Sequence, residues 1–367
     1  MRIEQKQNII YFQPFIKDAL PVQPSRQITI GSSRASFRKF MAEAPPRINW
    51  VKEKSIASGP DIHFSSPSGE LRSAFIESIR QAKTSIECMT FTFSDPELIL
   101  LLVQKAEEGV KVTVAIDKGH ENYLLPYKDK ITLVAKDSSQ GRLHHKITVI
   151  DQETVWIGSA NFSPEALLKQ SNTMIRLQSK ELALALHQEM EALLGTRRRS
   201  SEQPRPIEMD GQTVELLLFP RVPFGVQNAP EKALNEAGKK RIIEMIDNAQ
   251  TSLRFAVCVW TDPDLAQAVI RAKKRGVDVE VLVWKKAESR EIVMLFERAN
   301  IPVIEKPHLT LMHNKWAVID NEHFLNCSAN WSKSWFARND ESAVLLHSLT
   351  PEQVQSLNDY WKQLVVG

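Results

Sequence analysis

The alternation of apolar and polar positions divides most of the chain into short strands and amphipathic helices. Residues 86–93 form an apolar run with the length of a buried strand. Asp95 and Pro96 then provide a helix start, and Gly109 ends that helix before a second apolar run at 110–116. A strand, a helix and a second strand in this order predict parallel strands joined by a crossover helix. We therefore expect an α/β fold in which helices cover both faces of a sheet.

The same pattern occurs a second time further along the chain. Residues 79–118 align without a gap with residues 246–285, at an offset of 246 − 79 = 167. In each copy an amphipathic helix precedes the first strand, with apolar residues three or four positions apart. Similarity at one fixed offset indicates that the chain contains two equivalent halves.

Changes in composition predict the boundaries of these halves. Residues 196–213 are polar, contain proline and lack a period, which is typical of a linker between halves at 61–195 and 214–367. The arginines at 197–199 are interpreted as a solvated basic turn. Several prolines interrupt residues 1–60, which predict an N-terminal arm that is partly extended or disordered.

Composition places few limits on function. With 367 residues, 43% of them hydrophobic and 25% charged, the chain is typical of a globular protein of two domains. Its net charge of +3 neither requires nor excludes a polyanionic partner. Cys88, Cys258 and Cys327 lack the spacing of a disulfide framework or a zinc finger, which favours a reducing compartment. The N-terminus has no signal-peptide pattern, and no run approaches the roughly 20 apolar residues of a membrane span. We expect a cytoplasmic or peripheral membrane protein, and secretion without a signal peptide stays open.

Two copies of one polar motif lie at equivalent places in the halves, with the histidines at an offset of 313 − 144 = 169. Each copy has histidine and lysine two residues apart, then aspartate, then a small residue followed by serine and asparagine. The members are His144, Lys146, Asp151, Gly158, Ser159 and Asn161 in the first half and His313, Lys315, Asp320, Cys327, Ser328 and Asn330 in the second. Side chains two apart on a strand project from the same face, so each histidine–lysine pair is expected to enter one site.

These residue types suit the cleavage of a phosphodiester. One neutral imidazole can attack phosphorus, and the other, as imidazolium, can protonate the leaving oxygen. Lysine ammonium and asparagine amide groups can donate hydrogen bonds to the non-bridging oxygens as charge develops there. Because these donors already supply positive charge and are not ordinary metal ligands, we expect neither a metal nor a cofactor.

The paired motif resembles the signature of the phospholipase D superfamily, HxK(x)4D(x)6GSxN in two copies, over about residues 62–366. The resemblance implies two pseudo-twofold-related halves, each a mixed, mostly parallel sheet flanked by helices. One active site would lie between the halves, so a monomer suffices. By the same resemblance His144 is the nucleophile and His313 the acid and base. The residues expected to support the site without touching substrate are Asp151, Asp320, Ser159, Ser328 and Glu341.

The chain departs from the family pattern at two places. Cys327 replaces the usual glycine, and it would be strained if that position needed a positive φ but would fit if only a small side chain were needed. Family members often carry Asn-x-Glu downstream, with the carboxylate fixing the histidine tautomer. The second half has this acid as Glu341, whereas Asn172 in the first half is followed by Met174. The orienting carboxylate of the first half is therefore missing or comes from elsewhere.

The sequence leaves three functions open. They are cleavage or transfer at a phospholipid with peripheral membrane contact, hydrolysis of DNA or RNA by the same chemistry, and a non-catalytic binding role on the same fold. The basic clusters at 239–241 and 273–275 are interpreted as solvated helix faces rather than a nucleic-acid groove. Tryptophans 260, 331 and 335 are interpreted as core residues. Lipid is narrowly favoured by low charge and by apolar residues near the second motif. These residues are candidates for exposed loops, with burial as the alternative, and they are Leu309, Leu311, Met312, Trp335 and Phe336.

Overall fold

The computed structural model describes residues 59–366 except 67, 227–228, 285–286, 307–309, 333–334 and 337, together with two short strands near the N-terminus. The contact pattern separates one unit, Met1 with Gln13–Ala57, from a second that contains the rest of the chain. The expected arm at 1–60 therefore lies almost entirely outside the described residues, and the following account concerns the second unit.

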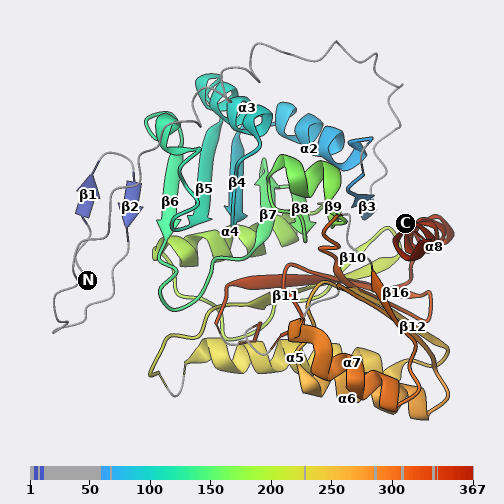
Figure 1. The fold of residues 1–367 in the computed structure, drawn as a ribbon. Coiled ribbons are helices and arrows are strands. Elements are labelled where there is room, and N and C mark those ends of the chain that lie inside the picture. The colour runs from blue at the N-terminus through green and yellow to red at the C-terminus, as the bar shows by residue number, and fades with distance from the viewer. Residues whose placement is uncertain are drawn as a thin grey trace. The chain divides into compact units, whose positions relative to one another are not determined.

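The first half is built on a nine-stranded sheet in the order β1-β2-β6-β5-β4-β7-β8-β9-β3. Helices α2 (Glu70–Arg80) and α3 (Pro96–Glu107) cover one face, and α4 (Lys180–Leu194) packs on the other (Figure 1). Two short helical turns are η1 (Leu125–Tyr127) and η2 (Glu165–Lys169). The strands are β1 (Glu4–Lys6), β2 (Ile9–Tyr11), β3 (Asp61–Phe64), β4 (Ser85–Thr90), β5 (Lys111–Asp117), β6 (Thr132–Lys136), β7 (Lys146–Ile150), β8 (Thr154–Gly158) and β9 (Thr173–Gln178).

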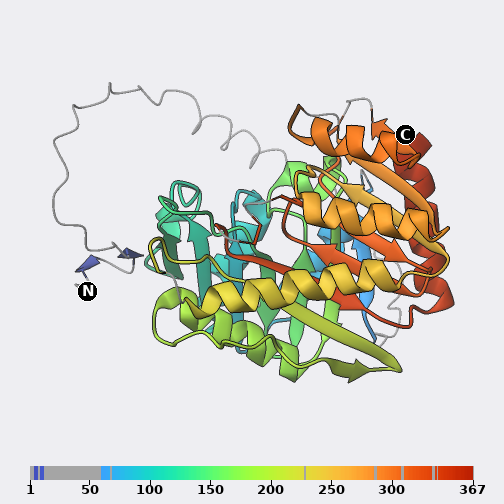
Figure 2. The same ribbon diagram turned by 90° about the horizontal axis from the view of Figure 1, so that it is seen from below.

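The second half repeats this design on an eight-stranded sheet in the order β10-β11-β17-β16-β15-β12-β13-β14. Helices α5 (Pro230–Asn248), α6 (Pro263–Lys274) and α7 (Arg290–Arg298) lie side by side on one face, with η3 (Ala287–Ser289) before α7 (Figures 1 and 2). Helix α8 (Pro351–Val366) packs on the other face. The strands are β10 (Ile207–Met209), β11 (Gln212–Phe219), β12 (Ser252–Val257), β13 (Asp278–Trp284), β14 (Val303–Lys306), β15 (Lys315–Ile319), β16 (His323–Cys327) and β17 (Glu341–Leu346). Strand β10 and the start of β11 fall within the segment 196–213 that was expected to be a linker.

Both sheets are mixed, as expected, but the expectation that they are mostly parallel is wrong. In the second half, parallel pairing among the described strands is confined to β12 with β13 and β13 with β14. The strands that carry the motifs pair antiparallel: β4 with β7, β7 with β8 and β8 with β9, and likewise in the second half. The reason is the length of the connections. The three-residue turn at 151–153 can join only antiparallel strands, whereas a parallel pair needs a long crossover.

The capping residues explain why the crossover helices start and end where the sequence predicts. Asp95 accepts hydrogen bonds from the backbone N–H groups of Glu97 and Leu98 at the start of α3. Asp262 does the same for α6. Gly109 and Gly276 follow the two helices with φ of 93° and 97°, a conformation that other residues adopt only with strain. The repeated helix boundaries thus come from the same local chemistry.

A shared core joins the two halves. One cluster of buried side chains lies between the first sheet and α2 and α3, and another lies between the second sheet and α5, α6 and α7. The third contains residues of both sheets, such as Val149 and Trp316, together with residues of α4 and α8. Trp260, Trp331 and Trp335 are fully buried in the second half, which confirms that they are core residues. No helix of the described part is both long and apolar enough to cross a membrane.

Candidate active site

The two histidine–lysine pairs enter the structure at equivalent strand starts. Lys146 is the first residue of β7 and Lys315 the first of β15, and each histidine lies two residues before its lysine. Both lysine side chains are fully buried. The Nζ of Lys146 donates a hydrogen bond to the carbonyl oxygen of His144 at 2.6 Å, and Lys315 donates equivalently to His313. Each lysine side chain is thus held against the backbone of the histidine two residues before it.

Two backbone bridges bring the motifs of opposite halves together. The N–H of His144 donates to the carbonyl oxygen of Asp340, which comes just before β17, at 2.9 Å. The N–H of His313 donates to the carbonyl oxygen of Ser171, just before β9, at 2.8 Å. The segment before each histidine therefore runs parallel to the start of a strand in the other half. The residue after each bridge, Glu341 or Asn172, is thereby placed beside the histidine of the opposite half.

A carboxylate from the second half orients His144. Its Nδ1 lies 2.9 Å from Oε2 of Glu341, which also accepts a hydrogen bond of 2.6 Å from the hydroxyl of Ser328. Although burial acts to raise it, the pKa of Glu341 is lowered by His144 and Lys146. An ionised carboxylate can only accept hydrogen bonds, so Nδ1 of His144 carries the proton and Nε2 is left with a lone pair.

An amide from the first half orients His313 in the same way. Nδ1 of His313 lies 2.9 Å from Oδ1 of Asn172. The amide nitrogen of Asn172 donates to the carbonyl oxygen of Ala166 at 2.9 Å, and the hydroxyl of Ser159 donates to Oδ1 at 3.0 Å. These contacts fix the oxygen of the amide toward His313. Nδ1 of His313 must therefore be the donor, which leaves the lone pair of each histidine on Nε2.

The structure corrects which residue of the first half corresponds to Glu341 of the second half. Met174 was aligned with Glu341, but Asn172 is the true counterpart. Glu341 follows Ser328 by 13 residues and Asn172 follows Ser159 by 13, and the offset 341 − 172 = 169 equals that of the histidines. Each lies against the serine of its own motif and the histidine of the other half. The first half therefore has an amide where the second has an acid, and the carboxylate that serves His144 comes from the opposite half.

Cys327 occupies its position without backbone strain. Neither it nor Gly158 has a positive φ. A Cβ added to Gly158 would come within 2.2 Å of the carbonyl oxygen of Thr173 on β9, so the first half needs glycine for close strand contact. Gly158 faces the large Met174, whereas Cys327 faces the small Ala343. The sizes of the paired residues are exchanged between the halves, so the presence of Cys327 in place of glycine is a matter of packing.

Burial and repulsion between nearby cations lower the pKa values of both histidines and of Lys146. Burial lowers the pKa of His144 to about 4, and the nearby lysines add to this against the opposing effect of Glu341. Burial, then Lys315 and Lys146, hold the pKa of His313 well below its usual value. Burial, with the charge of Lys315, lowers the pKa of Lys146 to about 7. A bound anion would favour the charged form of every one of these groups.

The motif aspartates hold turns rather than entering the site. Asp151 begins the turn after β7 with φ of 54°, and its carboxylate accepts hydrogen bonds from the backbone N–H groups of Lys83, Thr84 and Ser85. Asp320 begins the turn after β15 with φ of 56° and makes the equivalent contacts. Each ties the hairpin that carries a histidine and a lysine to the start of a neighbouring strand, β4 or β12.

The motif asparagines carry unused hydrogen-bonding capacity. Asn161 and Asn330 lie in the turns after β8 and β16 and are half-buried. The amide oxygen of each is buried and has no hydrogen-bond partner in the part of the chain that the structure describes. Turning each amide by half a rotation would place two N–H donors at these points. Donors there would suit the oxygens of a phosphate.

The rim of the site differs between the halves, which sequence reasoning missed. The ring of Phe91, after β4, lies 5.5 Å from the ring of His144 and 4.2 Å from that of His120. The guanidinium of Arg142 lies 5.3 Å from the centre of the same ring. At the repeat offset, Leu311 stands where the first half has Arg142. The first half thus lines the rim with a cation and aromatic rings, and the second half places an apolar side chain there.

The apolar residues near the second motif, which were candidates for an exposed group, are buried or half-buried where the structure describes them. Met312 and Trp335 are fully buried, and Leu311 and Phe336 are half-buried, while Leu309 lies outside the described residues. Trp335 stacks on Phe336 with ring centres 4.5 Å apart. These side chains serve packing, because the segments that carry them bridge the two halves or cover the core of the second.

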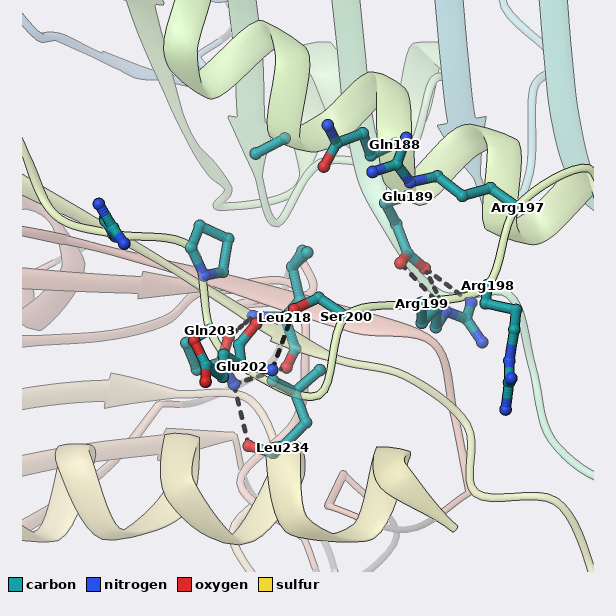
Figure 3. A pocket seen from close by; sticks show the side chains of 13 residues that line it. Gln188, Glu189, Arg197, Arg198, Arg199, Ser200, Glu202, Gln203, Leu218 and Leu234 are labelled. Atoms are coloured by element: carbon teal, nitrogen blue, oxygen red, sulfur yellow. Dashed lines mark hydrogen bonds and ion pairs between the residues drawn. The ribbon is translucent and has the colours of Figure 1, made fainter.

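A buried charge cluster lies behind the site. The guanidinium of Arg199 is 2.7 Å from Glu189 (Figure 3) and 2.9 Å from Asp340. His145 is 3.6 Å from Glu189. The interpretation of residues 197–199 as a solvated turn is therefore wrong for Arg199, because its side chain fills this cluster. Since Asp340 precedes Glu341, the cluster supports the strand start that orients His144. No group of three or more histidine, cysteine, aspartate or glutamate side chains in the described ranges could hold a metal ion.

Comparisons with known proteins agree with this geometry. A family model described as "cardiolipin synthase, PLD-like domain" matches residues 75–194 and 242–365. The mitochondrial cardiolipin hydrolase of Xenopus tropicalis is 29% identical over 117 residues, which are 31% of this chain and 56% of that protein. The 5'-3' exonuclease PLD3 of Xenopus laevis is 29% identical over 147 residues, 34% of this chain and 30% of that protein. The chain thus spans only about half or less of the length of these relatives.

A solved structure extends the likeness to the whole fold. The phosphatidylserine synthase of Haemophilus influenzae Rd KW20 superimposes with a TM-score of 0.63 and 16% sequence identity. The superposition covers 83% of this chain and 86% of that one. At this identity the likeness is one of fold alone, and it includes both halves.

Proposed function

This chain belongs to the phospholipase D-like family, and we propose that its paired histidines cleave or transfer the phosphodiester of a phospholipid through a covalent phosphohistidine. One observation carries the proposal. His144 and His313 are each held through Nδ1 by a side chain from the opposite half, at 2.9 Å in both cases. This arrangement leaves the lone pair of each histidine on Nε2, which is the form that a nucleophile or a general base requires, and it therefore favours an enzyme over a protein that only binds.

In the first step, the neutral His144 attacks phosphorus with Nε2 while His313, as imidazolium, faces the leaving oxygen. The Nε2–P bond forms and the P–O bond to the leaving alcohol breaks. The proton on His313 Nε2 passes to the alkoxide, which leaves as a neutral alcohol. His313 is neutral in the empty site, so the phosphodiester anion must first raise its pKa and bring a proton in.

In the second step, the now neutral His313 takes a proton from water, and the resulting hydroxide attacks phosphorus. The P–Nε2 bond breaks, His144 regains its lone pair, and a phosphomonoester leaves. If an alcohol takes the place of water, the same step gives transfer instead of hydrolysis. Lys146, Lys315, Asn161 and Asn330 are assigned to the non-bridging oxygens, where their donors stabilise charge as it develops.

The unequal partners of the histidines support this division of roles. The ring of a phosphorylated His144 keeps its proton on Nδ1 and is cationic, so an adjacent carboxylate stabilises it more than an amide would. His313 faces the neutral Asn172 and is therefore the stronger acid of the two as imidazolium. A stronger acid protonates a poor leaving group more readily, which suits His313 to that role.

A phospholipid is favoured over a nucleic acid because most cations of the two basic clusters form ion pairs. On α5, Lys239 pairs with Asp262 and Asp264, and Arg241 pairs with Glu215. Just after α6, Arg275 lies 3.8 Å from a carboxylate oxygen of α5. These cations form ion pairs on helix surfaces and do not line a groove for a polyanion. The family model and the hydrolase relative are also named for lipids.

The test is a panel of substrates assayed in parallel, with cardiolipin, phosphatidylcholine, single-stranded DNA and RNA. We expect turnover of phospholipid that persists in excess EDTA, since lysine and amide donors supply the positive charge. His144→Ala and His313→Ala should each abolish it. Cys327→Ala is a buried control within the second motif, at a position with a packing role, and it should retain turnover. Turnover of nucleic acid alone would move the proposal to a nuclease, and turnover of no substrate would indicate a binding protein.

A further inference from the structure

The loop between β11 and α5 carries two exposed apolar side chains near the site. Phe224 is 88% exposed and Val226 is 50% exposed. The two side chains lie two residues apart on one loop and form a small exposed apolar group, which is a feature of surfaces that contact a partner or a membrane. Sequence reasoning placed such residues beside the second motif, where they prove to be packed.

The loop is tied to the segment that leads into the first motif. The guanidinium of Arg221 donates to the carbonyl oxygens of Asp137 and Gly141, at 2.6 and 2.9 Å. The N–H of Phe224 approaches the side-chain oxygen of Gln140 at 3.5 Å. Because His144 follows this segment by only three residues, the exposed loop has a defined position next to the active-site rim.

Positive charge lies beside the loop. A groove of about 530 Å³ is lined by arginines of the segment 197–199 on one side and by Pro223 and Val226 on the other, with Glu231 also present. Arg198 is exposed, forms no ion pair with a described residue, and extends away from the Glu189–Arg199 pair (Figure 3). Arg197 is exposed too, and its one ion pair, with Glu191, is long at 3.7 Å.

We propose that Phe224, Val226, Arg197 and Arg198 form a docking patch for the surface of a bilayer that contains anionic phospholipids. The proposal rests on the function proposed above, in which the substrate is a phospholipid. Apolar side chains that enter the acyl boundary, with arginines at the level of the headgroups, are the arrangement expected of a peripheral membrane protein. The patch would hold the active-site rim at the depth where scissile phosphodiesters lie.

A bilayer fits the patch better than a protein partner does. A stable protein interface buries about 800 Å² on each side, with many well-packed residues. Two apolar side chains and two arginines fall far short of that area. Insertion into a bilayer needs only a few side chains, because the lipid moulds itself around them and each arginine adds attraction to anionic headgroups.

The experiment measures flotation of the full chain with vesicles of phosphatidylcholine, with and without phosphatidylglycerol. Wild-type protein should float with the anionic vesicles, and Phe224→Asp should bind them about tenfold less tightly. Replacing Arg197 and Arg198 by serine should weaken binding about tenfold on anionic vesicles only. Met294→Asp is the matched control, because Met294 is 41% exposed on α7 and lies outside the patch. It should bind like wild type.

Turnover of the water-soluble bis(p-nitrophenyl) phosphate, measured on the same variants, separates this proposal from the proposed function. We expect all of them to match wild type with this substrate, because the patch contains no catalytic residue. Equal vesicle binding by wild type and Phe224→Asp would overturn the docking proposal, whatever the turnover. So would a dimer in sedimentation equilibrium that Phe224→Asp dissociates without changing vesicle binding, because the patch would then join two copies. Vesicle binding without any turnover would instead sink the proposed function and leave the docking patch standing.

Discussion

Replacing Glu341 by glutamine tests whether this carboxylate of the second half serves His144 of the first half. In the structure the carboxylate lies 2.9 Å from Nδ1 of His144 and also accepts hydrogen bonds from Ser328 and Asn339. Glutamine has the same shape and an oxygen that can still accept from Nδ1. The substitution therefore removes the negative charge, and it makes the environment of His144 resemble that of His313 beside Asn172.

The magnitude follows from the charge that is lost. Unit charges about 4 Å apart interact by about 4 kcal/mol at an effective dielectric constant of 20. His144 becomes cationic only as it bonds to phosphorus, so this energy is lost from the transition state and not from the resting enzyme. Since each 1.36 kcal/mol corresponds to a factor of ten in rate, kcat should fall about a thousandfold.

The assay is steady-state hydrolysis of bis(p-nitrophenyl) phosphate by Glu341→Gln, compared with wild type and with Asp95→Asn. Asp95 is a fully buried carboxylate that caps α3 and pairs with Arg72. Its replacement should lower stability and leave kcat within a fewfold of wild type. A kcat for Glu341→Gln within threefold of wild type would refute the reasoning, because the carboxylate would then not serve the histidine that turns cationic.

Three further predictions concern other parts of the site. Asp151→Asn should lower the free energy of unfolding in urea by about 2 kcal/mol, through weakened contacts to three backbone N–H groups, while the folded enzyme keeps its kcat; an unchanged midpoint would contradict the structural role. Gly158→Ala should lower the melting temperature markedly, because the added Cβ would meet the Thr173 carbonyl oxygen at 2.2 Å. Cys327→Ala should change the melting temperature little. Equal effects of the two substitutions would show that packing does not explain why one half has glycine and the other cysteine. Binding of sulfate at pH 7 should take up about half a proton or more, because an anion raises the pKa of Lys146 above its value of about 7 and draws protons onto the histidines. Calorimetry in buffers of different ionisation enthalpy measures this uptake, and a binding heat that does not depend on the buffer would contradict it.

Much of the fold could be predicted because its signals are local. The Asp-Pro and glycine helix boundaries occur twice at one offset, and their capping contacts are made within a few residues. Mixed sheets were expected, but the extent of antiparallel pairing was underestimated, because the pattern of a buried strand does not encode its direction. The three-residue spacing between motif strands did contain that information, since only a hairpin fits it.

The site could be predicted in its membership but not in its connections. Motif spacing identified the histidines, lysines and asparagines, yet contacts such as His144 with Glu341 join residues 197 positions apart and depend on how the halves dock. The correspondence between Asn172 and Glu341 could have been predicted, because the histidine offset of 169 also relates these two residues. Burial of Arg199 and Met312 was not, since polar and apolar residues in loops acquire their environment only from tertiary contacts.

The most direct test of the central claim is to trap the covalent intermediate. Wild-type enzyme would be mixed with a radiolabelled phosphodiester, quenched within a single turnover, and digested under conditions that preserve phosphohistidine for peptide mapping. The mechanism predicts label on the peptide that contains His144, and none in the His144→Ala variant. Label on His313 would reverse the assigned roles, and rapid turnover without any protein-bound label would contradict covalent catalysis by this pair of histidines.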